Sequence, residues 1–376
     1  MQEYLGKDIP KLGFGLMRPP MIGEDVDMEQ LARMVDLFME KGFSYFDTAW
    51  GYLNGKSELA AREVLVERYP RERFQFATKL PAWAVSTAEE AKNMFRTSLD
   101  RTGLEFFDFY LLHNLGGTGN VRTETFDRFG IWDFLAEQKR EGRIRHLGFS
   151  MHAKAAHLDE VLSKHPEMDF VQLQINYADW ENPVIESRKC YETAMKHGKP
   201  VVIMEPVKGG ALANLPEPAA EIFSRAEPGR SQASWALRYA ASLEGIVTVL
   251  SGMSTVDQMK DNLSVMENFR PLNKEERTVI ERVQQALSAI PQVPCTDCRY
   301  CLKGCPEHIS IPGVFAAVND YLVYRNMARA KSRYGFETAS GGKASACIRC
   351  GACEEVCPQG IPIIAELAKA AEIFGM

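Results

Sequence analysis

Short apolar runs alternate with amphipathic stretches over residues 1–270 of the chain. Between the apolar runs, residues such as Leu31, Val35 and Phe38 recur at helical spacing after the acidic helix start at Asp27. Strands joined by helices run parallel, with right-handed crossovers. The repeated pattern therefore predicts an α/β fold, a closed (β/α)8 TIM barrel. Its eight strands are expected at 12–16, 43–47, 74–78, 107–112, 144–149, 169–173, 200–204 and 246–250.

A doubly wound open sheet is the alternative arrangement of the same elements. That fold favours a Gly-x-Gly-x-x-Gly turn after the first strand, where a dinucleotide binds. Here Gly13-Phe-Gly15 is followed by Leu16-Met17-Arg18, so the glycine fingerprint is absent. The barrel is therefore the favoured fold.

A proline-marked linker at 289–294 separates two predicted domains. We expect the barrel to occupy residues 1–288 and a second module to occupy residues 295–376. Within this module, helical patterns at Val314–Arg333 and at 362–373 predict a mainly α-helical domain.

The charge balance excludes several classes of protein. The chain has 44 Lys and Arg against 50 Asp and Glu, a net charge of −6, which argues against a broad surface for nucleic acid or anionic lipid. The sequence contains no run of 18 apolar residues, so it predicts no membrane span. The first residues also lack the basic and apolar segments of a secretory signal, so we expect a cytoplasmic protein with no nucleic-acid or membrane partner.

Eight of the nine cysteines follow Pro294. A secreted disulfide scaffold would not leave the rest of the chain almost without cysteine, so the cluster indicates metal binding. The cysteines form two runs of identical spacing, C-x2-C-x2-C-x3-C-P, at Cys295, Cys298, Cys301 and Cys305 and at Cys347, Cys350, Cys353 and Cys357.

This spacing is the signature of bacterial ferredoxins, whose thiolates hold [4Fe–4S] clusters. The resemblance implies two clusters, and in two-cluster ferredoxins the last Cys of each run ligates the other cluster. We therefore expect Cys357 to complete the first cluster and Cys305 the second. Structural zinc is the alternative, although its four-ligand sites do not require two runs with Cys-Pro endings. An electron-carrier protein is a candidate partner. The basic run Arg325–Arg333 could dock an acidic carrier, but a solvated helix face is the favoured interpretation.

Polar residues end several predicted strands, at the edge of a barrel where active sites lie. Asp47 ends the second strand, Tyr52 follows in the next loop, Lys79 ends the third strand and His113 the fourth. These four residues resemble the Asp-Tyr-Lys-His tetrad of the aldo-keto reductases, and the resemblance spans residues 1–285. With the tetrad and the cysteine module taken together, the chain resembles the iron–sulfur branch of that family.

The chemistry of carbonyl reduction suits these four residue types. The reaction needs a hydride and a proton for the developing alkoxide, but a phenol with a pKa near ~10 is a poor acid/base at neutral pH. The Lys79 ammonium is therefore expected to lower the pKa of Tyr52. Asp47 would keep Lys79 charged in a buried site, and His113 would orient the carbonyl oxygen.

The resemblance also implies a coenzyme site for NAD(H) or NADP(H). Ser150 and Gln172 match residues that bind the nicotinamide carboxamide, and Met204 takes the place of the aromatic residue that stacks on the ring. Gly252 and Gln258 stand where NADP(H)-preferring members have basic residues, so the choice of coenzyme is open. Further candidates for coenzyme contact are Gly15, Leu16, Met17, Glu205, Gly252 and Asn262.

The two modules would transfer different numbers of electrons. A nicotinamide transfers two electrons as a hydride, whereas a [4Fe–4S] cluster transfers one electron. Three interpretations are open. The clusters could exchange electrons with the active site of the barrel, or they could be purely structural in an ordinary carbonyl reductase. The whole chain could also be an electron-transfer protein whose barrel binds a ligand without catalysing a reaction. The complete tetrad argues against the last reading. We expect an oxidoreductase acting on a small carbonyl or alcohol substrate. Trp50, Leu53, Trp83 and Trp180 are candidates for the wall of its pocket.

Overall fold

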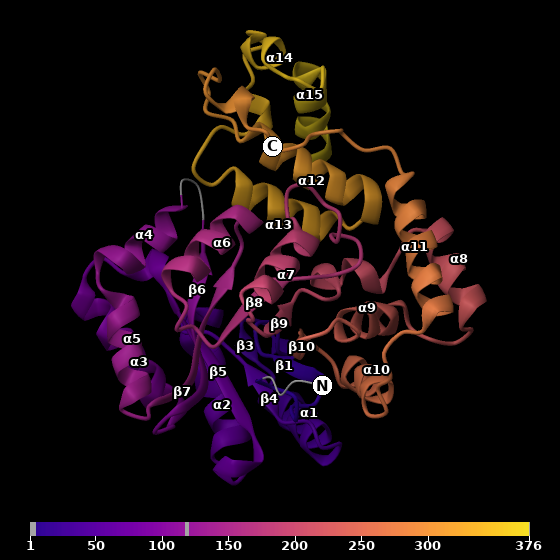
Figure 1. Ribbon diagram of the computed structural model, residues 1–376. Helices are drawn as coiled ribbons and strands as arrows, with labels where there is room; N and C mark the ends of the chain where they lie inside the picture. Colours follow the sequence, from indigo (N-terminus) through magenta and orange to yellow (C-terminus); the bar gives the residue numbers. More distant parts are fainter. Residues whose placement is uncertain (1–4, 117–119, 376) are drawn as a thin grey trace. The chain divides into compact units, whose positions relative to one another are not determined.

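The computed structural model describes residues 5–116 and 120–375 (Figure 1). The chain forms two compact units, Met1–Lys208 with Ala233–Lys274, and Gly209–Gln232 with Glu275–Met376. The second unit therefore includes a segment from the middle of the chain as well as the cysteine-rich part. Within the described ranges, no helix has both the length and the apolar character needed to cross a membrane.

Eight parallel strands among the described residues close into a barrel in the order β1-β10-β9-β8-β7-β6-β5-β4. Each predicted apolar run overlaps one of these strands, so the predicted (β/α)8 barrel is confirmed. The strands are β1 (Leu12–Gly15), β4 (Tyr45–Asp47), β5 (Gln75–Pro81), β6 (Phe107–Leu115), β7 (Ile144–Met151), β8 (Phe170–Gln174), β9 (Val201–Met204) and β10 (Ile246–Ser251). The short hairpin of β2 (Met21–Ile22) and β3 (Asp25–Val26) was not predicted, because its two-residue strands carry no periodic pattern.

Helices connect the barrel strands, and their first turns follow the sequence signals. Asp27 Oδ1 accepts a hydrogen bond from Gln30 N at 3.0 Å. Thr87 Oγ1 accepts one from Glu90 N at 3.2 Å, while the Glu90 carboxylate accepts one from Ser86 N at 2.7 Å, as in a capping box. The helices are α1 (Met28–Glu40), α2 (Lys56–Ala61), α3 (Ala88–Thr102), α4 (Val121–Arg128), α5 (Ile131–Arg140), α6 (Ala155–Lys164), α7 (Ser187–Lys196), α9 (Gln232–Ala241) and α10 (Val256–Met266).

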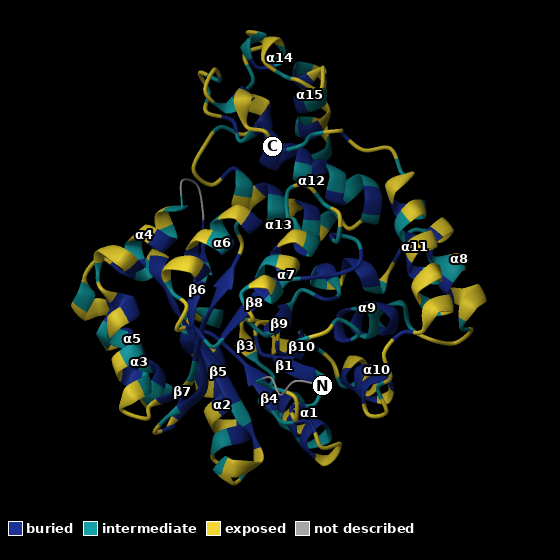
Figure 2. Cartoon of the chain, viewed as in Figure 1, coloured by how far each residue is buried: buried dark blue, intermediate teal, exposed yellow. Residues whose placement is uncertain are grey.

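An apolar cluster fills one end of the barrel interior. Tyr45 and Phe170 begin their strands, and with Ile9, Phe109 and Val247 they form a buried plug at the N-terminal ends of the strands. The strands are buried along most of their length (Figure 2). Since side chains close the barrel at this end, a small molecule can enter only at the C-terminal ends, where the polar residues lie.

The second unit is mainly helical, with one break that the sequence did not reveal. The expected single helix over Val314–Arg333 is wrong, because it divides at Arg325, which has a left-handed φ of 53°. The Asn326 side chain then caps the next helix by accepting a hydrogen bond from Arg329 N at 3.0 Å. The helix expected at 362–373 is present as α15. The helices are α8 (Glu217–Ala226), α11 (Lys274–Ser288), α12 (Ile311–Tyr324), α13 (Met327–Glu337), α14 (Ala352–Glu355) and α15 (Ile363–Phe374).

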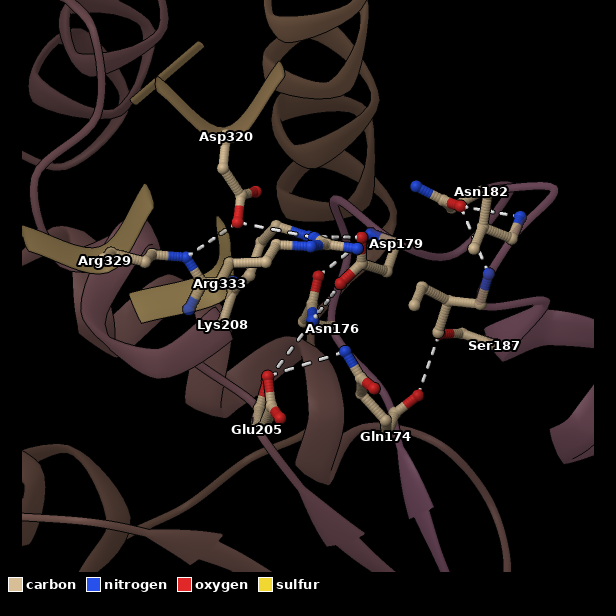
Figure 3. Close-up of polar contacts among 12 residues, drawn as sticks. Gln174, Asn176, Asp179, Asn182, Ser187, Glu205, Lys208, Asp320, Arg329 and Arg333 are labelled. Carbon is tan, nitrogen blue, oxygen red and sulfur yellow. Dashed lines mark hydrogen bonds and ion pairs between the residues drawn. The ribbon is translucent and has the colours of Figure 1, made fainter. Parts of the chain in front are cut away.

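Two arginines of the basic run have a partner inside this unit. Arg329 Nε and Arg333 Nη1 lie 3.3 and 3.4 Å from Oδ2 of the buried Asp320 (Figure 3). A buried carboxylate needs such compensation. These two guanidinium groups are therefore engaged in joining α12 to α13, which weakens the expectation that they dock an acidic carrier.

Candidate functional site

A buried ion pair lies at the C-terminal ends of β4 and β5. In the register of these strands Asp47 stands opposite Ala77, which brings Lys79 beside the Asp47 side chain. Lys79 Nζ donates to Asp47 Oδ1 at 2.5 Å and to Thr48 O at 2.6 Å. The two side chains are 1% and 5% exposed. Lys79 Nζ also lies 3.5 Å from Tyr52 OH, so three of the four tetrad residues form one hydrogen-bonded chain.

Tyr52 begins a turn with an unusual backbone. The next two residues, Leu53 and Asn54, have left-handed φ values of 51° and 56°, and Gly55 has a φ of 90°. Such conformations disfavour side chains and persist only where the surroundings hold them. A side chain at Gly55 would also meet the Arg101 guanidinium at 2.6 Å, so this position requires glycine.

The buried Glu58 carboxylate supports this turn through Arg101. Arg101 Nη1 donates to Trp50 O at 3.0 Å and to Glu58 Oε2 at 3.2 Å. Thr78 Oγ1 and Ser98 Oγ donate to Glu58 Oε1 at 2.8 and 2.7 Å. No sequence pattern indicates this cluster, because its members come from separate helices and strands that only the closed barrel brings together.

The expected net lowering of the Tyr52 pKa is wrong for the protein alone. Burial raises the pKa of Tyr52 above its usual value of 10.0, and this outweighs the Lys79 charge, which lowers it. Burial also acts to lower the pKa of Lys79, but the Asp47 carboxylate and Tyr52 raise it overall. At neutral pH the site therefore holds a protonated phenol beside a charged ammonium.

His113 lies next to this chain on β6. Its ring centroid is 5.7 Å from that of Tyr52 and 4.9 Å from that of Trp83. Burial, helped by the Lys79 charge, lowers the pKa of His113 well below its usual range, so the imidazole is neutral. Among the described residues, its buried Nδ1 has no hydrogen-bond partner. A neutral ring with spare bonding capacity suits the recognition of a carbonyl oxygen.

Two of the expected coenzyme residues take part in hydrogen bonds within the barrel. Ser150 Oγ accepts a hydrogen bond from Asn114 N at 2.7 Å. Gln172 Nε2 donates to Asp47 Oδ2 at 3.2 Å, so this amide also supports the ion pair. Met204 ends β9 on the same edge of the barrel. The structure thus places Ser150, Gln172 and Met204 on neighbouring strands, as the pairing of β7, β8 and β9 requires.

The remaining candidates lie around the ends of β1, β9 and β10. Leu16 N donates to Asp47 O at 2.8 Å, which links the end of β1 to the ion pair, while the Met17 side chain is half exposed. A side chain at Gly15 would lie 3.4 Å from Ser251 O. Asn262 Nδ2 donates to Ser251 Oγ at 2.7 Å and so holds the segment that leads to Gly252. After β9, Glu205 adopts a left-handed φ of 53°.

A second buried ion pair at this edge was not expected from the sequence. Lys208 Nζ donates to Asp179 Oδ1 at 2.5 Å (Figure 3). Asn176 Nδ2 donates to Asp179 Oδ2 at 2.9 Å and to Glu205 O at 3.2 Å, and Gln174 Nε2 lies 3.5 Å from Glu205 Oε2. These contacts hold together the loops that follow β8 and β9.

The eight cysteines of the second unit line two cavities. The first cavity is lined by three thiols of the first run and the last thiol of the second, and the other by the remaining four. Ile311 lines both cavities, so they are neighbours. The two groups are Cys295, Cys298, Cys301 and Cys357, and Cys305, Cys347, Cys350 and Cys353.

The backbone of both cysteine runs curls in the same way. Asp297 and Arg299 flank Cys298 with left-handed φ values of 53° and 65°, and Arg349 and Gly351 flank Cys350 with 60° and 85°. Consecutive turns of this kind direct successive thiols and backbone N–H groups toward one concave space. The conformation is repeated although only one of the four positions is glycine, which indicates that both runs have the same role.

Two family models match this chain. Residues 11–285 match the Aldo/keto reductase family, and residues 294–361 match the 4Fe-4S dicluster domain. An aldo-keto reductase of Mycolicibacterium vanbaalenii is 26% identical over 259 residues, which cover 69% of this chain and 83% of that protein.

Solved structures show the same fold for the barrel. The holo form of the aldo-keto reductase AKR11C1 from Bacillus halodurans is 26% identical, with a TM-score of 0.58, and the match covers 75% of this chain and 95% of that one. An aldo-keto reductase from Klebsiella pneumoniae in complex with NADPH has a TM-score of 0.58 at 19% identity, covering 76% of this chain and 96% of that one.

Proposed function

This chain belongs to the aldo/keto reductase family of oxidoreductases, and from that premise we propose that it moves hydride between a nicotinamide coenzyme and a small carbonyl or alcohol substrate. The observation that carries the proposal is the hydrogen-bonded chain of Asp47, Lys79 and Tyr52 beside the neutral His113. Lys79 and Tyr52 would be a costly pair to bury in a barrel that only binds a ligand.

The residues at the mouth of the barrel fit a nicotinamide coenzyme. A side chain at Gly252 would meet only Gly15 O, at 4.0 Å, among the described residues, so the space beside β1 is open. Gln172 uses its N–H group on Asp47 and keeps its carbonyl oxygen for a carboxamide. Ser150 accepts a backbone N–H and keeps its hydroxyl hydrogen to donate. When bound, the coenzyme supplies the hydride.

Within this proposal, the four tetrad residues handle the proton and the carbonyl oxygen. Tyr52 is protonated in the protein alone, and it donates its proton as negative charge develops on the substrate oxygen. The Lys79 ammonium stabilises the phenolate that this leaves, and Asp47 holds Lys79 in place. Neutral His113 donates a hydrogen bond to the same oxygen.

Isotope transfer tests this function directly. NADH and NADPH carrying deuterium at the transferable C4 position are incubated with the protein and an aromatic aldehyde. We expect the product alcohol to carry deuterium at its new C–H bond, detected by mass spectrometry. An alcohol without deuterium, or no alcohol with either coenzyme, would refute hydride transfer at this barrel. The comparison of the two coenzymes also decides which one the site prefers.

We further propose that the two groups of four thiols hold two [4Fe–4S] clusters that transfer electrons. Four thiols line each cavity, and both runs have the same C-x2-C-x2-C-x3-C-P spacing. This favours clusters over zinc. The alternative is that the clusters are purely structural. If both groups of thiols held a cluster, the two clusters would supply two electrons, which together with one proton are equivalent to one hydride.

Metal analysis and a redox assay test this second proposal. After anaerobic reconstitution we expect about eight iron atoms and eight sulfides per chain. Cys350→Ala should lose about half of the iron, since it removes a ligand of one cluster, whereas Cys190→Ala, in the barrel, should lose none. Zinc in place of iron would refute the assignment. Fading of the reduced-cluster EPR signal as NAD(P)H forms would support electron transfer, and an unchanged signal would leave the clusters structural.

A further inference from the structure

Arg122, on α4, is a half-buried cation with no carboxylate partner among the described residues. Its Nη1 donates to the neutral Asn114 Oδ1 at 2.8 Å, and its Cζ lies 5.6 Å from the ring centroid of Trp83. Burial lowers the pKa of Arg122 from its usual value, but an arginine side chain still carries its charge at neutral pH. A cation removed in part from water without a counter-ion is costly, which suggests that a ligand supplies the missing charge.

Arg122 lies close to His113, one of the four tetrad residues. Trp83 is close to both Arg122 and His113, since its ring centroid lies 5.6 Å from Arg122 Cζ and 4.9 Å from the His113 centroid, and Asn114 directly follows His113 in the chain. The guanidinium is thus no farther from the imidazole than these two ring separations together. The Arg122 charge also contributes to the lowered pKa of His113, after burial, Lys79 and His152, which agrees with this proximity.

The two side chains offer complementary contacts to one small molecule. Trp83 is 54% exposed, so its indole is free to pack against the body of a substrate. Arg122 presents five N–H donors, of which the contact with Asn114 uses one. The others can form a bidentate pair with a planar carboxylate or with a phosphate.

We propose that Arg122 and Trp83 form an oxyanion subsite, so that the substrate is a small carbonyl compound whose far end carries a carboxylate or a phosphate. This inference rests on the proposed function of the barrel. The carbonyl group lies at Tyr52 and His113, the intervening atoms lie along Trp83, and the anion binds Arg122. The anion is unchanged in the reaction, in which the carbonyl carbon gains hydride and its oxygen gains the proton of Tyr52.

Matched substrates test the subsite. The rate constant kcat/KM is measured for 4-carboxybenzaldehyde, for its uncharged methyl ester and for 4-formylphenyl phosphate, with the wild-type protein and with Arg122→Met. We expect the wild type to favour the anions, and Arg122→Met to lower their kcat/KM by about 10- to 100-fold while changing the ester by less than about 2-fold. Whichever anion loses more identifies the preferred group. Arg128→Met removes the same charge from the exposed side of α4 and should change none of the three.

Two results would overturn the subsite: equal use of acid, phosphate and ester by the wild type, or an equal loss for all three in Arg122→Met. If the wild type reduces none of them, the proposed function fails, and the subsite is then tested by binding. Titration calorimetry with benzoate and benzamide should show tighter binding of benzoate to the wild type, and loss of that difference in Arg122→Met. Equal affinities for benzoate and benzamide in the wild type would refute the subsite independently of catalysis.

Discussion

Replacing Tyr52 by Phe is expected to lower kcat for carbonyl reduction by about 10²- to 10⁴-fold, the usual contribution of a positioned general acid. The variant keeps the ring beside His113 and removes only the hydroxyl that lies 3.5 Å from Lys79 Nζ. KM should change little, because the phenol acts mainly as the proton leaves it. Steady-state kinetics with saturating coenzyme measures both parameters.

The pH profile separates a catalytic role of Tyr52 from a structural one. Because burial raises its pKa above 10.0, the phenol is protonated through neutral pH, and the reduction rate of the wild type should fall only at strongly alkaline pH. Tyr52→Phe should lose this alkaline limb. Tyr45→Phe is the matched control, since Tyr45 is buried at the closed end of the barrel and its hydroxyl has no hydrogen-bond partner among the described residues. Activity of Tyr52→Phe equal to that of Tyr45→Phe would refute the assignment.

Replacing Asp47 by Asn is expected to destabilise the barrel by about 3–5 kcal/mol, because it leaves the Lys79 ammonium buried without its counter-ion. Both side chains are almost fully buried, at 1% and 5% exposure, so solvent cannot screen the loss. Chemical denaturation followed by circular dichroism, reading the transition of the barrel, measures the change. Asp25→Asn removes one partner of an exposed pair with Lys56 and should leave stability almost unchanged.

The double variant Asp47→Asn/Lys79→Met distinguishes stability from activity. With both charges removed, much of the lost stability should return, since an apolar side chain tolerates burial better than an unpaired ammonium. Activity should not return, because Tyr52 then lacks the cation that stabilises its phenolate. A double variant as unstable as Asp47→Asn would show that the packing of this site, rather than its charge pair, limits stability.

The sign of the pH dependence follows from Lys79. Its pKa in the folded protein is raised above the usual value, so the stability that the charged Lys79 side chain contributes is fully present below the pKa of a lysine in the unfolded chain. That stabilisation is lost as the pH rises through the higher pKa of the folded state. The wild type should therefore lose more stability than the double variant at strongly alkaline pH.

The sequence by itself determined the architecture of the barrel and the chemistry it presents. Eight short apolar runs between amphipathic stretches leave few folds other than a closed parallel barrel. Polar residues at or near the C-terminal ends of successive strands of such a barrel must gather at one rim, which is why Asp47, Lys79 and His113 could be singled out. The cysteine spacing likewise predicts metal binding from the sequence alone, because the residues of each run lie close together along the chain.

Only the tertiary structure decided the features that depend on burial or on distant partners. The Tyr52 pKa is raised because desolvation inside the closed barrel exceeds the effect of Lys79, and a sequence shows charges but not their removal from water. Glu58 and Arg101 meet because α2 and α3 pack side by side. The candidate role of Arg122 likewise depends on the fold, because only the folded structure shows which charged groups lie near a side chain.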